Sequence, residues 1–243
     1  MQLTDKVVLV TGGARRVGRA IALRLARAGC DIAVHYRSST EEAQEVVAGC
    51  QRLGREAEAF QADLDDLLEA ARLPQAAFER FGRLDALINN ASLFEIMPID
   101  SFSVEDWERT LRVNLTAPMV LVHAAREMLR AARGRVINLC DVSTSRPWPD
   151  HLAYMVSKGG LDTLTHVLAR ALAPDVNVVG IAPGVAAWPD EYDEELRQRL
   201  TKRIPLRRPG TEEDIAAAAE FLLRDGDYIT GTILPVDGGR HIV

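Results

Sequence analysis

The sequence is poor in cysteine and lysine, and it has no long apolar run. Its three cysteines, Cys30, Cys50 and Cys140, have no Cys-x-x-Cys spacing, and an odd number does not suit a disulfide framework or a zinc site. No run approaches the ~18 apolar residues of a membrane-spanning helix. The start of the chain has no basic region followed by a long apolar segment. We therefore expect no metal site, no export and no membrane insertion, and a cytoplasmic location is the default expectation.

Excess positive charge is missing too. The formal net charge of the 243-residue chain is -6, which does not favour nucleic acid or a membrane surface as a partner. Hydrophobic residues make up 47% of the chain, enough to bury a core. Lysine occurs only as Lys6, Lys158 and Lys202, so a lysine inside a motif is less easily explained as a chance occurrence.

Short apolar stretches alternate with amphipathic stretches along the whole chain. Continuous apolar stretches predict strands buried on both faces, and the amphipathic stretches between them predict helices. We therefore expect one α/β domain over residues 1–243, a Rossmann-type doubly wound parallel sheet of about seven strands with helices on both faces. The expected strands are 6–11, 31–36, 57–63, 84–89, 135–141, 176–182 and 232–237.

The segment 186–209 departs from this alternation. It is rich in charge and contains Trp188, Pro189, Pro205 and Pro209. This composition predicts an insertion over the carboxyl edge of the sheet that covers the substrate. A plain surface excursion is an equal alternative.

A glycine-rich turn joins the first expected strand to the first expected helix. In "TGGARRVG" the glycines at 12, 13 and 18 permit a tight turn, and the following helix N-terminus favours an anion. In this position the turn predicts the phosphate site of a dinucleotide. An ordinary tight turn between strand and helix is the alternative.

The end of the second expected strand indicates which dinucleotide binds. An NAD site usually has an acidic residue there to hold the ribose 2′-hydroxyl, but "HYRSST" has no acid before Glu41. Arg37 with the hydroxyls of Ser38 and Ser39 suits a 2′-phosphate, because a guanidinium binds phosphate through two hydrogen bonds. We therefore expect NADPH/NADP+. The alternatives are a capping box of Ser39 with Glu42, and a solvated charge at Arg37.

Tyr154 and Lys158 lie four residues apart and share one face of an expected helix. An ammonium beside a phenol favours the phenolate and lowers the pKa of the tyrosine. The pair therefore predicts a proton donor, Tyr154, and a residue that lowers its pKa, Lys158. The sequence "NNAS" at 89–92 and Asn114 make this set of residues specific.

These motifs resemble the short-chain dehydrogenase/reductase family over essentially the whole chain. The matching stretches are "TGGARRVG", "DL" at 63–64, "NNAS", Asn114, "YMVSK", "PG" at 183–184 and "YITGTILPVDGG". The resemblance implies that Tyr154 donates the proton, Lys158 binds the ribose and tunes Tyr154, and Asn114 supports a proton relay. It also implies a homotetramer. The expected cofactor contacts are Gly12, Arg16, Val17, Gly18, Arg37, Ser38, Ser39, Asp63, Leu64, Asn90, Ala91, Ser92, Tyr154, Lys158, Pro183, Gly184 and Val185.

Two positions depart from the usual pattern of that family. Most members have glycine where Arg16 stands, and serine thirteen residues before the tyrosine, where this chain has Asp141. A carboxylate would repel the oxyanion that develops on a carbonyl substrate, whereas it can accept from a ring N–H or deliver a proton to a ring nitrogen. Both departures, with Phe94 after "NNAS", resemble the pteridine reductase branch.

This resemblance implies NADPH-dependent reduction of a pterin, of the dihydrobiopterin, dihydromonapterin or dihydrofolate type, to its tetrahydro form. Asp141 and Tyr154 would manage protons, and Phe94 would stack on the ring. Arg16 would contact cofactor phosphate and pterin, and Ser92 would contact cofactor and substrate.

Other interpretations stay open. Trp188 suits the closing of a substrate pocket and the packing of its own loop equally well. Phe94 could pack under a loop, and Asp141 could cap the next helix. The cost of burying the Asp141 charge would be offset by ring N–H donors or avoided by protonation. The alternative functions are an NADPH-dependent carbonyl or 3-oxoacyl-thioester reductase and a non-catalytic NADP(H)-binding regulatory protein.

Overall fold

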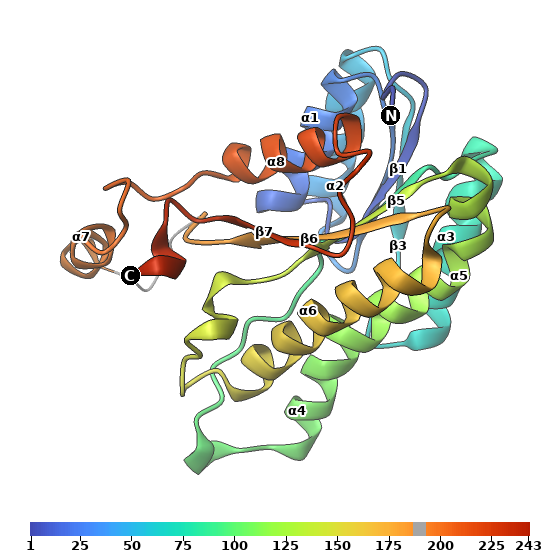
Figure 1. Ribbon diagram of the computed structural model, residues 1–243. Helices are drawn as coiled ribbons and strands as arrows, with labels where there is room; N and C mark the ends of the chain where they lie inside the picture. The colour runs from blue at the N-terminus through green and yellow to red at the C-terminus, as the bar shows by residue number, and fades with distance from the viewer. Residues whose placement is uncertain (187–192) are drawn as a thin grey trace.

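Seven parallel strands form the centre of the molecule (Figure 1). The computed structural model describes residues 1–186 and 193–243, and its strand order is β3-β2-β1-β4-β5-β6-β7. The expected doubly wound sheet is confirmed, because β1 to β3 add in one direction and β4 to β7 in the other. The strands are β1 (Val7–Val10), β2 (Asp31–Tyr36), β3 (Ala57–Gln61), β4 (Ala86–Asn89), β5 (Arg135–Leu139), β6 (Asn177–Pro183) and β7 (Ile233–Val236).

Helices cover both faces of the sheet in two groups (Figure 1). The helices α1, α2 and α8 cover one face, while α3, α5 and α6 cover the other, with α4 packed against α6. No helix among the described residues is both long and apolar enough to cross a membrane. The helices are α1 (Arg16–Arg27), α2 (Thr40–Arg52), α3 (Leu67–Phe81), α4 (Val104–Leu111), α5 (Ala117–Ala132), α6 (Leu152–Leu172), α7 (Glu194–Thr201) and α8 (Glu212–Arg224).

Each face of the sheet has its own apolar core. Successive residues of a strand point to opposite faces, so Val7 and Leu9 pack in the core under α3 and α5, whereas Val8 and Val10 pack in the core under α1 and α8. Burial on both sides explains why the strands read as continuous apolar runs. It also explains why the expected strand bounds agree with the observed ones to within two residues.

Within the segment 186–209, the structure describes residue 186 and residues 193–209. Its helix α7 begins after Asp193, whose side chain accepts a hydrogen bond from the Leu196 amide at 2.8 Å. Residues 187–192, and with them the predicted contact Trp188, lie outside the described residues. Residues from 200 to 207 line a pocket beside the loop that follows β5. A covering role for the whole segment stays a prediction.

Candidate active site

The glycine-rich turn between β1 and α1 is shaped for close approach of a ligand to its backbone. Gly12 has a φ of +60°, and a Cβ on Gly18 would lie 2.1 Å from the Gly12 carbonyl oxygen, so a larger residue does not fit there. In the described structure no side chain caps the start of α1. The first N–H groups of this helix are therefore suited to a phosphate.

Three side chains around the turn hold its backbone in place. The Asn90 Nδ2 donates to the carbonyl oxygens of Thr11 at 2.8 Å and Gly12 at 3.1 Å. The Thr11 hydroxyl accepts from the amides of Asn90 at 2.9 Å and Ala91 at 3.0 Å. The Gly12 amide donates to the His35 Nδ1 at 3.0 Å, and burial lowers the pKa of His35, which keeps the acceptor neutral. The sequence analysis missed Thr11 and His35, although polar residues within apolar strands were the available signal.

A groove of about 280 Å³ lies beside this turn. It collects side chains from the carboxyl ends of β1, β2, β3 and β4, which meet at one edge of the sheet. No described residue forms an ion pair with the guanidinium of Arg37 on its wall. The groove thus brings together eight of the predicted cofactor contacts: Gly12, Arg37, Ser38, Ser39, Asp63, Leu64, Ala91 and Ser92. Their chemistry fits the adenine and ribose end of a dinucleotide.

The structure decides between the alternatives for Ser39. Ser39 precedes α2, but its side chain makes no capping hydrogen bond among the described residues, so the capping box with Glu42 is wrong. Glu42 lies instead 3.5 Å from the Nε of Arg15, a residue that lines the groove and that the sequence analysis did not single out. Arg16 is exposed, has a φ of +48° and forms no ion pair with a described residue. Its contacts with phosphate and pterin stay predictions.

The remaining cofactor residues lie outside the groove. Val17 is half-buried and packs against the core under α1. Pro183 ends β6, and the Gly184 amide donates to the carbonyl oxygen of Val236 at 3.0 Å. A Cβ on Gly184 would lie 2.7 Å from the Asp237 Cβ, which explains the glycine. The cofactor contacts of Pro183, Gly184 and Val185 stay predictions.

Tyr154 and Asp141 form the centre of the candidate catalytic site. The Tyr154 hydroxyl donates to the Asp141 Oδ2 at 2.7 Å, and the side chain of Tyr154 is only 8% exposed. The Asp141 Oδ1 accepts from the Ser143 amide at 2.7 Å and caps the short helix Val142–Ser145. Asp141 therefore caps this short helix, as the alternative interpretation predicts, and it also accepts the hydrogen bond from Tyr154. Asp141 is half-buried, and these two donors offset the cost of partly removing its carboxylate from water.

The expected direction of the Tyr154 pKa is wrong in this structure. Burial and the nearby charge and hydrogen bond of Asp141 raise the pKa of Tyr154 well above its usual value, because each of them disfavours the phenolate. The Lys158 Nζ donates to the Leu139 carbonyl oxygen at 2.6 Å and makes no hydrogen bond to the phenol oxygen in the described structure. It lies 5.7 Å from the centre of the Tyr154 ring. Burial also lowers the pKa of Lys158. Tyr154 is thus a neutral phenol that keeps its proton beside a carboxylate.

Asn114 lies in the π-helical turn Arg112–Thr116, between α4 and α5. Its side chain accepts from the Leu93 amide at 2.8 Å, and it donates to the Leu93 carbonyl oxygen at 2.9 Å and to the Ser157 hydroxyl at 3.0 Å. Asn114 therefore ties the loop after β4 to helix α6 and positions the segment that carries Phe94. Its part in a proton relay stays a prediction.

An aromatic cluster lies beside Tyr154. The ring centre of Phe94 is 4.7 Å from that of Tyr154, at an interplanar angle of 87°, and 5.9 Å from that of Trp148. Phe94 also stacks on His151, with ring centres 4.5 Å apart, while 47% of Phe94 stays exposed. Burial lowers the pKa of His151, so its ring is neutral. Phe94 thus packs against the loop after β5 and the start of α6, and it still offers surface to a ligand. The sequence analysis missed His151 and Trp148, since only the fold brings them to Phe94.

Comparisons with known proteins identify the family of this chain. The family described as "Enoyl-(Acyl carrier protein) reductase" matches residues 12–241. The chain is 35% identical to glucose 1-dehydrogenase 2 of Bacillus subtilis, covering 99% of this chain and 96% of that one. It is also 35% identical to the 3-oxoacyl-[acyl-carrier-protein] reductase FabG of Staphylococcus aureus, covering all of both chains. A blue fluorescent protein from a metagenomic library, solved in complex with NADPH, superimposes with a TM-score of 0.92 at 34% identity, covering 99% of each chain.

The chain is a nicotinamide-dependent oxidoreductase with a small-molecule substrate. It belongs to the short-chain dehydrogenase/reductase family. The expected family, fold and nicotinamide cofactor are confirmed. The expected pteridine reductase branch finds no support in these relatives, whose names favour the carbonyl alternative over pterin reduction. The homotetramer stays a prediction.

Proposed function

We propose that the chain reduces pterins with NADPH. The observation that carries this proposal is the 2.7 Å hydrogen bond from the Tyr154 hydroxyl to the Asp141 Oδ2. The serine that most family members have at position 141 can donate to a carbonyl oxygen, whereas a carboxylate can only accept. A carboxylate next to the proton donor suits a substrate with ring N–H groups and a C=N bond. Pterins have both.

The residues of this chain would handle the proton of the reaction. NADPH, when bound, would supply the hydride for the carbon of the C=N bond. The ring nitrogen gains electron density as that carbon is reduced, and it takes the proton held by the Tyr154–Asp141 pair. Phe94, with 47% of its surface exposed, offers a flat apolar face on which the ring can be positioned. Solvent then returns a proton to the pair.

The choice of NADPH over NADH rests on the groove beside the glycine-rich turn. Arg37 lines this groove without an ion-pair partner among the described residues, and the Ser39 side chain is not used as a helix cap. A 2′-phosphate would supply the missing partner. The solved relative that binds NADPH supports the same choice.

Replacing Arg37 with alanine is expected to weaken NADPH binding by about 30-fold and NADH binding by less than about threefold, because only NADPH has the phosphate that the guanidinium contacts. Fluorescence titration of both cofactors measures the two dissociation constants. Arg52→Ala, at the far end of α2, is the matched control and should change neither constant. Equal weakening of both cofactors by Arg37→Ala would contradict the assignment of the phosphate to this residue.

Carbonyl reduction is the second candidate, and the comparisons favour it. The 3-oxoacyl-[acyl-carrier-protein] reductase matches the whole chain at 35% identity. On this alternative Tyr154 would donate to a carbonyl oxygen, and Asp141 would have to turn away from that oxygen or carry a proton.

Substrate-dependent loss of NADPH absorbance separates the two candidates. We expect turnover with dihydrobiopterin and dihydrofolate, and rates at least about 100-fold lower with acetoacetyl-coenzyme A, because Asp141 opposes an oxyanion. Turnover confined to the ketone substrate would overturn the pterin proposal and establish the second candidate. Cofactor binding without turnover of either class would overturn both.

A further inference from the structure

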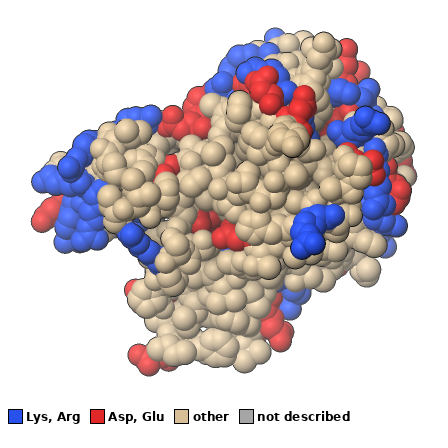
Figure 2. Space-filling view, in the orientation of Figure 1, with Lys and Arg blue, Asp and Glu red and all other residues tan. Residues whose placement is uncertain are grey.

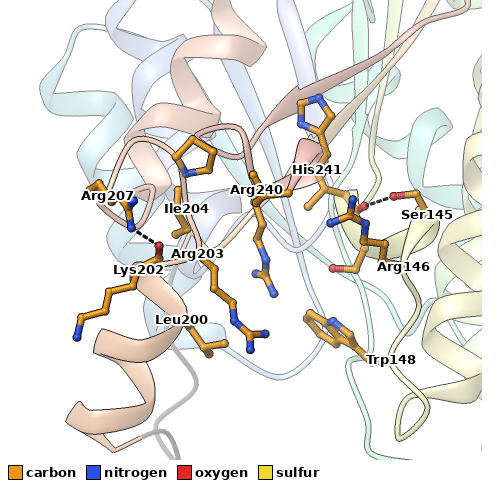
Figure 3. A pocket seen from close by; sticks show the side chains of 14 residues that line it. Ser145, Arg146, Trp148, Leu200, Lys202, Arg203, Ile204, Arg207, Arg240 and His241 are labelled. Carbon is orange, nitrogen blue, oxygen red and sulfur yellow. Dashed lines mark hydrogen bonds between the residues drawn. The ribbon is translucent and has the colours of Figure 1, made fainter.

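A pocket of about 840 Å³ beside the aromatic cluster is lined by basic side chains and by no aspartate or glutamate among the described residues (Figure 3). Its walls come from the loop after β5, from the end of α7 with the turn that follows it, and from the short C-terminal helix Arg240–Ile242. The five arginine and lysine side chains that line it are Arg146, Lys202, Arg203, Arg207 and Arg240. Such a concentration is unexpected in a chain whose net charge is -6.

These five cations have no carboxylate partners within the described structure. Arg207 donates only to the backbone oxygen of Lys202. Just outside the pocket, by contrast, Arg208 pairs with Asp214 at 3.0 Å, as many other arginines of the chain pair with an acid. Figure 2 shows that lysine and arginine side chains gather over α7, at the left of the view. Like charges held together repel, and a bound anion would relieve that repulsion.

The pocket lies next to the candidate catalytic site. The Arg240 guanidinium lies 5.7 Å from the centre of the Trp148 ring, and Trp148 lies 5.9 Å from Phe94. Val142 and Ser143, which follow Asp141 directly, form part of the wall. A substrate whose ring lies on Phe94 can therefore extend past Trp148 into the basic pocket.

Of the five basic side chains that line the pocket, Arg203 and Arg240 point most directly toward Trp148. In Figure 3 both side chains extend toward Trp148, Arg203 from the turn after α7 and Arg240 from the C-terminal helix, whereas Lys202 points away from it. Two guanidinium groups placed in this way can each bind a carboxylate through paired hydrogen bonds. A pterin ring has no carboxylate, so the anion must belong to a substituent at the far end of the substrate.

We propose that this basic pocket binds the carboxylate-bearing tail of the substrate, so that a pterin conjugated to an amide-linked dicarboxylic amino acid is preferred over a free pterin. This inference rests on the proposed function for the identity of the ring. The binding of the tail itself depends only on the pocket.

The double variant Arg203→Gln/Arg240→Gln tests the pocket by turnover and by binding. We expect kcat/KM for dihydrofolate to fall about 30- to 100-fold, mainly through KM, and kcat/KM for dihydrobiopterin, which has no carboxylate, to change less than about threefold. Calorimetry with p-aminobenzoylglutamate, the tail without the ring, should detect binding to the wild type that is lost in the variant and weakened by salt. The control Arg208→Gln removes a neighbouring charge that is already paired, and it should leave all these values unchanged.

The outcomes separate this inference from the proposed function. Equal effects of the double variant on both pterins, or binding of the isolated tail that the variant retains, would overturn the pocket assignment even if pterins are reduced. Charge-dependent binding of the tail supports the pocket even if neither pterin is turned over, a result that would overturn only the proposed function.

Discussion

Replacing Asp141 with serine is expected to lower the rate of dihydropterin reduction by about 1,000-fold, in the range of a lost proton-transfer group, while the dissociation constant of NADPH changes by less than about threefold. The reason is the position of this carboxylate. Its Oδ2 accepts the Tyr154 hydroxyl at 2.7 Å, and its Oδ1 is held by the Ser143 amide at the same distance. Steady-state rates with dihydrobiopterin and a fluorescence titration with NADPH measure the two quantities.

Asp141→Asn is the matched control for the charge. Asparagine has nearly the same size and can still accept from the Ser143 amide through its one side-chain oxygen, but its NH2 group can only donate toward Tyr154, and it is neutral and cannot take a proton. We expect Asp141→Asn to lose pterin reduction almost as fully as Asp141→Ser. Only the serine variant, which supplies a hydroxyl donor, should gain reduction of a ketone such as acetoacetyl-coenzyme A. Unchanged pterin turnover in either variant would refute the proton role of Asp141.

Tyr154→Phe is expected to lower kcat by about 1,000-fold with every substrate. The substitution removes the hydroxyl proton, which Tyr154 can donate whatever the charge of Asp141. NADPH binding should change less than about threefold, since the contacts in the groove are untouched. The raised pKa of Tyr154 adds an expectation for the wild type. A proton donor works in its protonated form, so ionisation of Tyr154 should not reduce the rate as the pH rises from 7 to about 9, below the ordinary tyrosine pKa of about 10.

Tyr228→Phe is the control for this substitution, because Tyr228 is fully exposed and far from the candidate site in sequence. It should leave kcat unchanged. A Tyr154→Phe variant that turns over substrate like the wild type would remove Tyr154 from the mechanism. A wild type without activity toward any pterin or ketone would favour the non-catalytic alternative.

The fold followed from local patterns in the sequence. Continuous apolar runs predicted the strands because both faces of this parallel sheet are buried under helices. Errors in the bounds fall at both ends of the strands, and two of the largest are at carboxyl ends, in the strands expected at 57–63 and 135–141, which end at Gln61 and Leu139. Asp63 and Asp141 lie just after the last backbone hydrogen bonds between these strands and their neighbours. At such positions a side chain is available to contact a ligand or to cap a helix.

Much of the candidate site was also predictable, because its residues follow strands whose carboxyl ends meet at one edge. Gly12, Arg37 and Ser39 follow β1 and β2, and the groove gathers them with residues that follow β3 and β4. The sequence analysis missed His35 and Thr11, which act through hydrogen bonds to backbone groups more than twenty residues away along the chain. No periodicity or spacing shows such partners.

The sequence by itself determined the parallel sheet, the glycine-rich turn, and the placement of Tyr154 and Lys158 on one helix face, because each depends on residues close together in the chain. Only the tertiary structure decided that the pKa of Tyr154 is raised, since burial and Asp141, not Lys158, surround its hydroxyl. The tertiary structure alone also placed Arg203 and Arg240 in one pocket beside Trp148. Burial and charge at a site depend on segments that meet only when the chain has folded.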